Sequence, residues 1–450
     1  MVAFIVRRLG VLGVILFGSS FILYNMAAIA GDPLRELRLS TDPGAEQQIL
    51  DLTRLYQLDV PPPLRYFIWL KGILGAFRGH IDFGKTRDAE PVINAISAAI
   101  PITIRLVTAA TLIAIILGIS LGIVTALRQY SRFDYSMTFV AFLMFSLPIF
   151  WVAVLLKQFL AIRFNNFLSN PVIPLKAIIL LSVFSGIFWS AIISGNRKRV
   201  IQIFAIAFTA NAALLELLSF TKWFATPSLG PIVILILGIG VAFGITQLST
   251  GISNRQSLYA ALSMAVLGTI GYFPAQWAFK SSHPRLAVLV MAVITIGFAI
   301  LSAQVFARVD KGPVARTAIL TSVIIALLII LDRLMREWAP YMANDAVNYR
   351  PVPTFGQTRE WFVAVPFWMR VLDTLIHLIL PTIALTLISF AGYIRYARGT
   401  LLEVLNQDYI RTARAKGLTE RTVIMRHAFR NTMIPLTTIM VADKIGRAHV

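Results

Sequence analysis

The chain has 450 residues, of which 57% are hydrophobic and only 14% are charged. Soluble domains carry about 25% charged residues, so the composition excludes an ordinary soluble domain and predicts a polytopic helical membrane protein. The net charge of +20 does not indicate nucleic-acid binding, because Lys and Arg lie mainly in short segments between apolar runs. Without cysteine, the chain can form no disulfide, thiol nucleophile or cysteine metal site.

The N-terminal apolar run follows Arg7 and Arg8 and extends over Leu9–Ala30. The small residues near its end give it some likeness to a secretory signal. It is longer than the apolar region of such signals, which has about 7–15 residues. We therefore expect an uncleaved first span with the N-terminus in the cytoplasm.

Apolar runs long enough to cross a hydrocarbon core of ~30 Å recur along the chain. We expect ten complete spans and an eleventh that begins near Met433 and is cut off. With the N-terminus inside, the loops expected in the cytoplasm hold most of the short-loop basic residues, which supports this topology. The expected complete spans are residues 9–30, 102–127, 136–161, 172–193, 200–219, 229–249, 258–279, 286–306, 317–332 and 371–394.

Two long segments are expected outside the membrane. Residues 31–101 contain amphipathic pieces at Gln47–Leu58 and Leu64–Phe77. We expect them to form a folded helical cap, because the apolar and aromatic side chains there need burial. These side chains are Tyr66, Phe67, Trp69 and Leu70. Residues 336–370 are rich in proline and aromatic residues and are expected to lie along the outer membrane surface.

A polar, basic segment separates the last two apolar runs. It reads Asp408-Tyr-Ile-Arg-Thr-Ala-Arg-Ala-Lys-Gly417-Leu-Thr-Glu-Arg421. The pattern predicts a helix over Leu401–Lys416, ended by Gly417 in the left-handed conformation. Thr419 can cap a second helix at about Glu420–Arg430, and Pro435 then marks the return to the membrane. The alternative is an ordinary basic amphipathic surface helix.

This segment resembles the cytoplasmic coupling loop, or EAA loop, of ABC-importer permeases, specifically the dipeptide/oligopeptide (peptide/nickel) branch. Arg411, Thr412 and Ala413 stand where the family has its Glu-Ala-Ala triplet, and Gly417 stands at its glycine. Only Ala413 and Gly417 fit the general pattern, but Arg-Thr-Ala-Arg-Ala-Lys-Gly is typical of the peptide branch. The resemblance covers roughly the first 165 and last 80 residues. It includes Arg426–Pro435, Phe145–Trp151 and Leu380-Pro381-Thr382.

The resemblance implies an all-α permease subunit with type I importer-like architecture. Its partners would be a second homologous permease, two cytoplasmic ABC ATPase subunits and an extracytoplasmic binding protein, and its substrate a di- or oligopeptide. It implies no catalytic residue, cofactor or metal, since ATP hydrolysis resides in the partner ATPase. The implied ATPase-coupling residues are Asp408, Arg411, Thr412, Ala413, Ala415, Lys416, Gly417, Leu418 and Arg426. Candidates for lining the pathway are Pro148, Phe150, Pro381 and Thr382.

The middle of the chain departs from the family pattern, because residues 170–335 hold six apolar runs where simpler members have none. An even number of spans fits an insertion into an outer loop. The last seven residues are expected to be a non-native tail on a truncated chain. The expected organisation is a first span (1–30), an outer cap (31–101), core helices (102–165), the insertion (170–335), an outer loop (336–370), a core helix with coupling loop (371–443) and the tail (444–450).

Several local patterns have plainer explanations than a binding site. Gly79–Thr86 matches the phosphate-binding loop Gly-x4-Gly-Lys-Thr, but no strand precedes it, so we interpret it as a coincidence. Gly118 and Gly122 form a small-xxx-small ridge that suits close helix packing. His377 is expected to be hydrogen-bonded structure. Glu216, the one clear acid inside an expected span, is either functional or a solvated or paired residue near the outer end.

Two other classes of function remain open. A self-sufficient secondary transporter or channel should carry paired intramembrane charges or broken helices in symmetric halves, and we find neither in the sequence. A membrane-embedded enzyme should show polar residues clustered at one depth, and the motifs His-Glu-x-x-His and Gly-x-Ser-x-Gly are absent from the sequence. Pro148 and Pro381 are expected to kink their spans, which fits either a pathway or packing alone.

Overall fold

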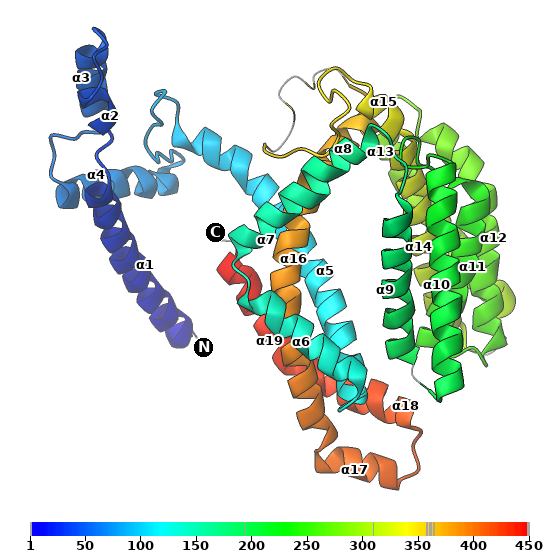
Figure 1. Ribbon diagram of the computed structural model, residues 1–450. Coiled ribbons are helices and arrows are strands. Elements are labelled where there is room, and N and C mark those ends of the chain that lie inside the picture. The colour runs from blue at the N-terminus through cyan, green and yellow to red at the C-terminus, as the bar shows by residue number, and fades with distance from the viewer. Residues whose placement is uncertain are drawn as a thin grey trace. The chain divides into compact units, whose positions relative to one another are not determined.

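The computed structural model describes residues 2–447 except for 194, 309, 357, 358, 360, 361, 363 and 364 (Figure 1). Within these residues the chain is helical, and its one β feature is an isolated bridge between Lys85 and Pro91. The all-α prediction is therefore confirmed. The chain divides into two compact units, Met1–Arg105 and Leu106–Val450, which we describe separately.

The first unit contains α1 (Val2–Ala30), α2 (Arg35–Arg38), α3 (Ala45–Leu55), α4 (Pro62–Leu74) and a 3-10 turn, Gly75–Arg78. Tyr66 of α4 is fully buried, and its hydroxyl lies 2.8 Å from the Ser20 hydroxyl of α1. Its ring meets those of Phe21 and Tyr24 edge-on, at centroid distances of 5.1 and 5.6 Å. The expected burial is confirmed for Tyr66 but wrong for Phe67, which is 51% exposed because it lies on the next face of the helix.

The expected spans are found as helices, with one exception. Nine helices in the described part of the chain are long and apolar enough to cross a membrane, or ten spans if one sharply bent pair is counted as a span. The nine are α1, α5 (Val92–Leu127), α9 (Leu175–Ile193), α10 (Arg197–Phe220), α11 (Gly230–Ser249), α12 (Arg255–Ala278), α13 (Pro284–Phe306), α14 (Lys311–Arg336) and α16 (Phe367–Leu405).

The exception is the span expected at 136–161. It is broken into α6 (Arg132–Ser146) and α7 (Ile149–Leu156), with a bend of 101° between the two segments. Leu147 and Pro148 adopt extended backbone conformations at the break, and Pro148 has no N–H to continue the helical ladder. The expected kink at Pro148 is confirmed. By contrast, α16 continues as one helix through Pro381.

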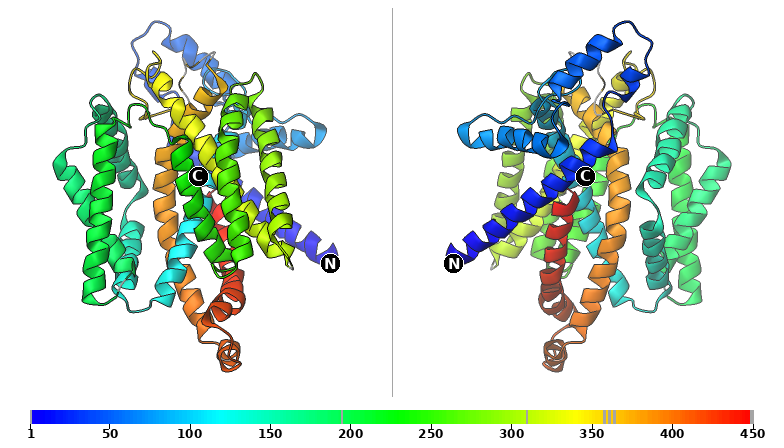
Figure 2. Two further views of the ribbon diagram at one scale, coloured as in Figure 1. Left: turned by 90° about the vertical axis from the view of Figure 1, so that its right-hand side faces the viewer. Right: turned by 90° about the vertical axis from the view of Figure 1, so that its left-hand side faces the viewer.

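After α7 the chain continues as a π-helix, Lys157–Arg163, and α8 (Phe164–Leu168). In the second unit, α9 and α10 pair with each other, and α11–α14 form a bundle whose apolar core also includes the beginning of α16 (Figures 1 and 2). The short helix α15 (Trp338–Met342) connects the end of α14 to this core. The fold thus places a helical bundle beside the long helix α16.

A second packing region surrounds the other half of α16, where α5 approaches very closely. A Cβ atom on Gly118 would lie 2.5 Å from the Cβ of Tyr393, and one on Gly122 would lie 2.7 Å from the Cβ of Ala397. Only glycine allows this backbone separation. The close packing expected from the Gly118–Gly122 ridge is confirmed, and it fixes α5 against the helix that leads to the basic segment.

Candidate functional site

The basic segment folds into a helical hairpin at the end of α16. It comprises α17 (Asp408–Ala415), a turn, α18 (Glu420–Thr422), a π-helix at Val423–Ala428 and α19 (Phe429–Arg447) (Figure 1). The single helix expected over Leu401–Lys416 is wrong, because α16 ends at Leu405. There the Asn406 side chain caps the helix by donating to the Leu402 carbonyl at 3.0 Å.

The second arm of the hairpin is longer than expected. Helical backbone continues from Glu420 beyond the expected end at Arg430 to Arg447, so Pro435 lies inside α19 instead of marking a new helix. Residues 444–447 of the expected tail belong to this helix, and residues 448–450 lie outside the described residues. The two arms are therefore joined by one short turn and lead directly back along α16, which α19 contacts.

The turn has the local chemistry that the sequence predicts. Gly417 has a φ of +73°, and its N–H donates to the Arg414 carbonyl at 3.0 Å. Thr419 is the N-cap of α18, and its side chain accepts from the Thr422 N–H at 3.4 Å. Both expectations are confirmed.

An ion pair spans the turn. The Arg414 guanidinium donates to both carboxylate oxygens of Glu420, at 2.7 and 3.2 Å. The hydrogen bonds from Arg414 lower the pKa of Glu420, and the same bonds raise the pKa of Arg414. Sequence reasoning missed this pair, although the two charges flank the predicted turn at a separation of six residues. It joins α17 to α18 on the solvent side.

The hairpin has one buried face and one open face. Ile410 and Ala413, one turn apart on α17, are 0% and 5% exposed. They pack in a cluster with Ala126 of α5, Leu401 of α16 and Val423 of the second arm. The hairpin is thus packed onto the ends of the membrane helices and is not a loose loop.

The expected coupling residues, apart from Ala413, lie toward the open face. The side chains of Asp408 and Arg411 are 96% and 71% exposed, with 3.6 Å between the Asp408 carboxylate and the Arg411 guanidinium. Thr412, Ala415, Lys416, Gly417, Leu418 and Arg426 are exposed as well. Ala413 serves the packing beneath them, and the role of the exposed residues in coupling stays a prediction.

A second ion pair supports the hairpin from within the helices. Asp134 of α6 is 2% exposed and accepts two hydrogen bonds from Arg398 of α16, at 2.8 and 2.9 Å. Ser131 caps α6 by accepting from the Asp134 N–H. Sequence reasoning missed this pair. The Ser131-x-x-Asp134 pattern marks a helix start, yet it cannot reveal a partner 264 residues away.

The expected pathway residues lie on two helices that pack together, α7 and α16. Pro148 precedes α7 and Phe150 lies within it, 69% exposed. Pro381 and Thr382 lie within α16. Further along α16, the Arg395 guanidinium lies 4.1 Å from the ring centre of Phe145, at the end of α6. The role of the four residues as pathway lining stays a prediction.

The remaining sequence patterns have structural explanations. The Nδ1 atom of His377 lies 2.8 Å from the Asp373 carbonyl oxygen, as expected for a structural histidine. Glu216 is exposed on α10. Gly79–Thr86 follows a 3-10 turn and not a strand, which supports its interpretation as a coincidence. Among the described residues, no group of three or more His, Cys, Asp or Glu could hold a metal ion.

These features define a multi-pass helical membrane protein with a packed helical hairpin at the end of its longest helix. Residues 270–446 match the family described as binding-protein-dependent transport system inner membrane component. Together with the peptide-permease relatives described next, this match confirms the resemblance to ABC permeases of the peptide branch. The match begins at residue 270, inside the segment expected to be inserted, so the bounds of the insertion stay a prediction.

Individual relatives are peptide permeases. The chain is 42% identical over 123 residues to the oligopeptide transport system permease protein OppB of Mycobacterium tuberculosis H37Rv, which is 27% of this chain and 35% of the relative. It is 46% identical over 84 residues to AppB of Bacillus subtilis, an oligopeptide transport system permease protein (18% and 27%). It is 52% identical over 69 residues to the dipeptide transport system permease protein DppB of Escherichia coli K12 (15% and 20%). The chain therefore spans about a third or less of the length of these relatives.

Proposed function

We propose that the protein is a permease subunit of an ATP-driven ABC importer for di- or oligopeptides. The observation that carries the proposal is the hairpin of α17 and α18, which combines a buried, helix-anchored face with an exposed basic face. A partner that moves such a hairpin also moves α5 and α16, because Ile410 and Ala413 pack on residues of both helices. The family match and the peptide-permease relatives support the substrate class.

In this proposal the partners are a second permease, two cytoplasmic ABC ATPases and an extracytoplasmic binding protein. The chain lies in the cell membrane with the N-terminus and the hairpin in the cytoplasm. ATP binding by the partner shifts the population between inward- and outward-open states, and the chain itself hydrolyses nothing. The 31–101 cap faces the binding protein.

The test is co-purification of the full chain with its candidate ATPase from the same membrane. Gly417→Pro should abolish association, because proline cannot adopt a positive φ and removes the hydrogen bond from the Gly417 N–H. Arg411→Glu and Arg426→Glu reverse exposed charges without disturbing the packed face and should weaken association at least tenfold. Arg255→Glu, an exposed charge at the start of α12, is the matched control and should bind as the unmodified chain does.

Solute uptake separates this proposal from a self-sufficient transporter or channel. Uptake in vesicles should depend on the ATPase and on ATP. Robust flux through the chain with no ATPase present would overturn the proposal and favour the transporter or channel alternative.

A further inference from the structure

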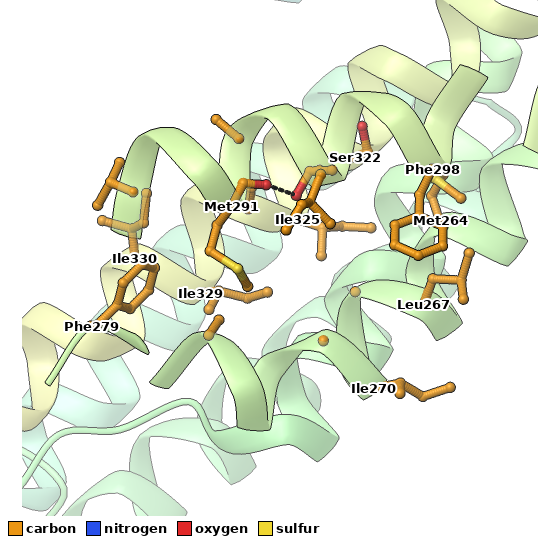
Figure 3. Close-up of a pocket in the computed structure, with 18 residues that line it drawn as sticks. Met264, Leu267, Ile270, Phe279, Met291, Phe298, Ser322, Ile325, Ile329 and Ile330 are labelled. Carbon is orange, nitrogen blue, oxygen red and sulfur yellow. Dashed lines mark hydrogen bonds between the residues drawn. The ribbon is translucent and has the colours of Figure 1, made fainter. Parts of the chain in front are cut away.

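An apolar groove lies between α12 and α13, with α14 as its floor, and it is separate from the hairpin. Its volume is about 230 Å³. Figure 3 shows its side chains, with Phe279 at one end and Met264, Leu267 and Phe298 at the other. Eighteen residues line it, and the side chains with hydroxyl groups, Thr295 and Ser322, bond to carbonyls of their own helices. The groove therefore offers an apolar ligand a nearly hydrocarbon surface.

The groove opens sideways toward the hydrocarbon of the membrane. Its floor residues on α14, Ile325 and Ile329, are 2% and 6% exposed. Its rim residues are exposed, with Ile270 of α12 at 63% and Phe298 of α13 at 48%. Both rim helices are candidate membrane spans, so the medium at the mouth of the groove is lipid.

The length of the groove fits one leaflet. Along α13 it extends from Val288 to Phe298, ten residues that rise ~15 Å. This is half of a hydrocarbon core of ~30 Å. The volume of the groove is ample for part of a lipid chain, since an apolar cavity of ~150 Å³ already binds benzene.

Basic side chains stand at one end of the groove. Beyond Phe279, the turn between α12 and α13 carries Lys280 and Arg285, both exposed. Arg285 is held beside the ring of Phe367, 5.6 Å from its centre. The proposed topology places this turn outside, where short loops are usually poor in Lys and Arg. Trp277, 80% exposed near the same end, suits the interface between headgroups and hydrocarbon.

We propose that this groove binds an anionic phospholipid of the outer leaflet. One acyl chain lies between α12 and α13 over Ile325 and Ile329, and the phosphate lies at Lys280 and Arg285. The two parts act together, because the apolar groove holds the chain while the two charges select the headgroup. The bound lipid fills a groove that would otherwise leave apolar side chains without contact.

The test uses the full chain in bilayers of equal phosphatidylglycerol and phosphatidylcholine. A trace of phosphatidylglycerol carries a photoreactive group near the end of one acyl chain, and labelled peptides are mapped by mass spectrometry. Label should concentrate on α12–α14. Gly271→Leu should reduce it at least fivefold, because a side chain at Gly271 meets no atom within 4 Å and fills the groove. Gly240→Leu on α11, equally free of close atoms, is the matched control and should leave the label unchanged.

Ala292→Phe fills the groove from α13, and it is a second variant that tests the proposal if Gly271→Leu does not fold. A double variant, Lys280→Ala with Arg285→Ala, should keep the acyl-chain label but lose the preference over a matched phosphatidylcholine probe. Equal labelling of filled and unmodified grooves would overturn the proposal. If the phosphatidylglycerol and phosphatidylcholine probes label the unmodified chain equally, Lys280 and Arg285 do not select the headgroup and that part of the proposal is wrong.

Discussion

Asp134 and Arg398 are 264 residues apart in the chain and form a two-pronged ion pair between α6 and α16. Their side chains are 3% and 29% exposed, so the pair lies largely out of water. Arg398 lies two turns before the end of α16, and the hairpin begins just after that end. The pair therefore fixes the helix that carries the hairpin against the first half of the broken span.

Removing both partners should destabilise the protein by less than the two single removals added together. Arg398→Ala leaves a buried carboxylate without its cation, which should cost about 3 kcal/mol. The double variant Asp134→Ala with Arg398→Ala should cost less than the sum of the single variants. Thermal unfolding in detergent measures each variant. Arg38→Gln, which breaks the exposed Arg38–Asp32 pair, is the control and should change stability by under ~1 kcal/mol. Additive single and double effects would contradict the pairing.

Glycine should be needed at Gly417 in the turn but not at Gly399 in the preceding helix, α16. Gly417→Ala should destabilise the hairpin by about 1 kcal/mol, because φ is +73° there and a Cβ atom is strained in that conformation. Gly399→Ala lies inside α16 with no atom near the added methyl, so it should be neutral or slightly stabilising. Hydrogen exchange across 408–422 measures both variants. Equal protection in the two would show that the left-handed turn is not required.

The α5–α16 contact should not accept even one methyl group. Gly122→Ala would place its Cβ 2.7 Å from the Ala397 Cβ and 2.9 Å from the Ile394 carbonyl oxygen. The helices must then move apart, at a cost of about 1–3 kcal/mol. Gly392→Ala, which meets no atom within 4 Å, is the control on the same helix pair. The melting temperature of each purified variant decides the matter, and unchanged melting of Gly122→Ala would refute the close approach.

The Arg414–Glu420 pair should stabilise the hairpin at neutral pH and fail in acid. Arg414 lowers the pKa of Glu420 below its usual value of 4.5. A carboxyl group whose pKa is lowered by folding contributes its stabilisation above that usual value and loses it as the pH falls through the lowered pKa. Hydrogen exchange at 414–422, compared with Glu420→Gln at each pH, should show extra protection at pH 7. That difference should begin to shrink as the pH falls below 4.5 and disappear once the pH is below the lowered pKa, and a difference that does not shrink on acidification would contradict the assignment.

The sequence predicts features that depend on local chemistry. Apolar runs locate the spans, Gly417 and Thr419 define the turn, and Gly118 with Gly122 marks a close helix contact, because each needs only neighbouring residues. Contacts between distant residues leave no such pattern, which is why Asp134 escaped notice. The end of α16 at Leu405 was also missed, since Asn406 and Gln407 are weaker helix breakers than glycine or proline.

The break at Leu147 and Pro148 separates two halves that are held differently. The helical hydrogen-bond pattern stops there, so α6 and α7 do not form one continuous helix. Asp134 ties α6 to α16 near the hairpin, while α7 continues into the π-helix and α8. The joint therefore turns the chain by 101° while both halves stay packed on the same helix, α16.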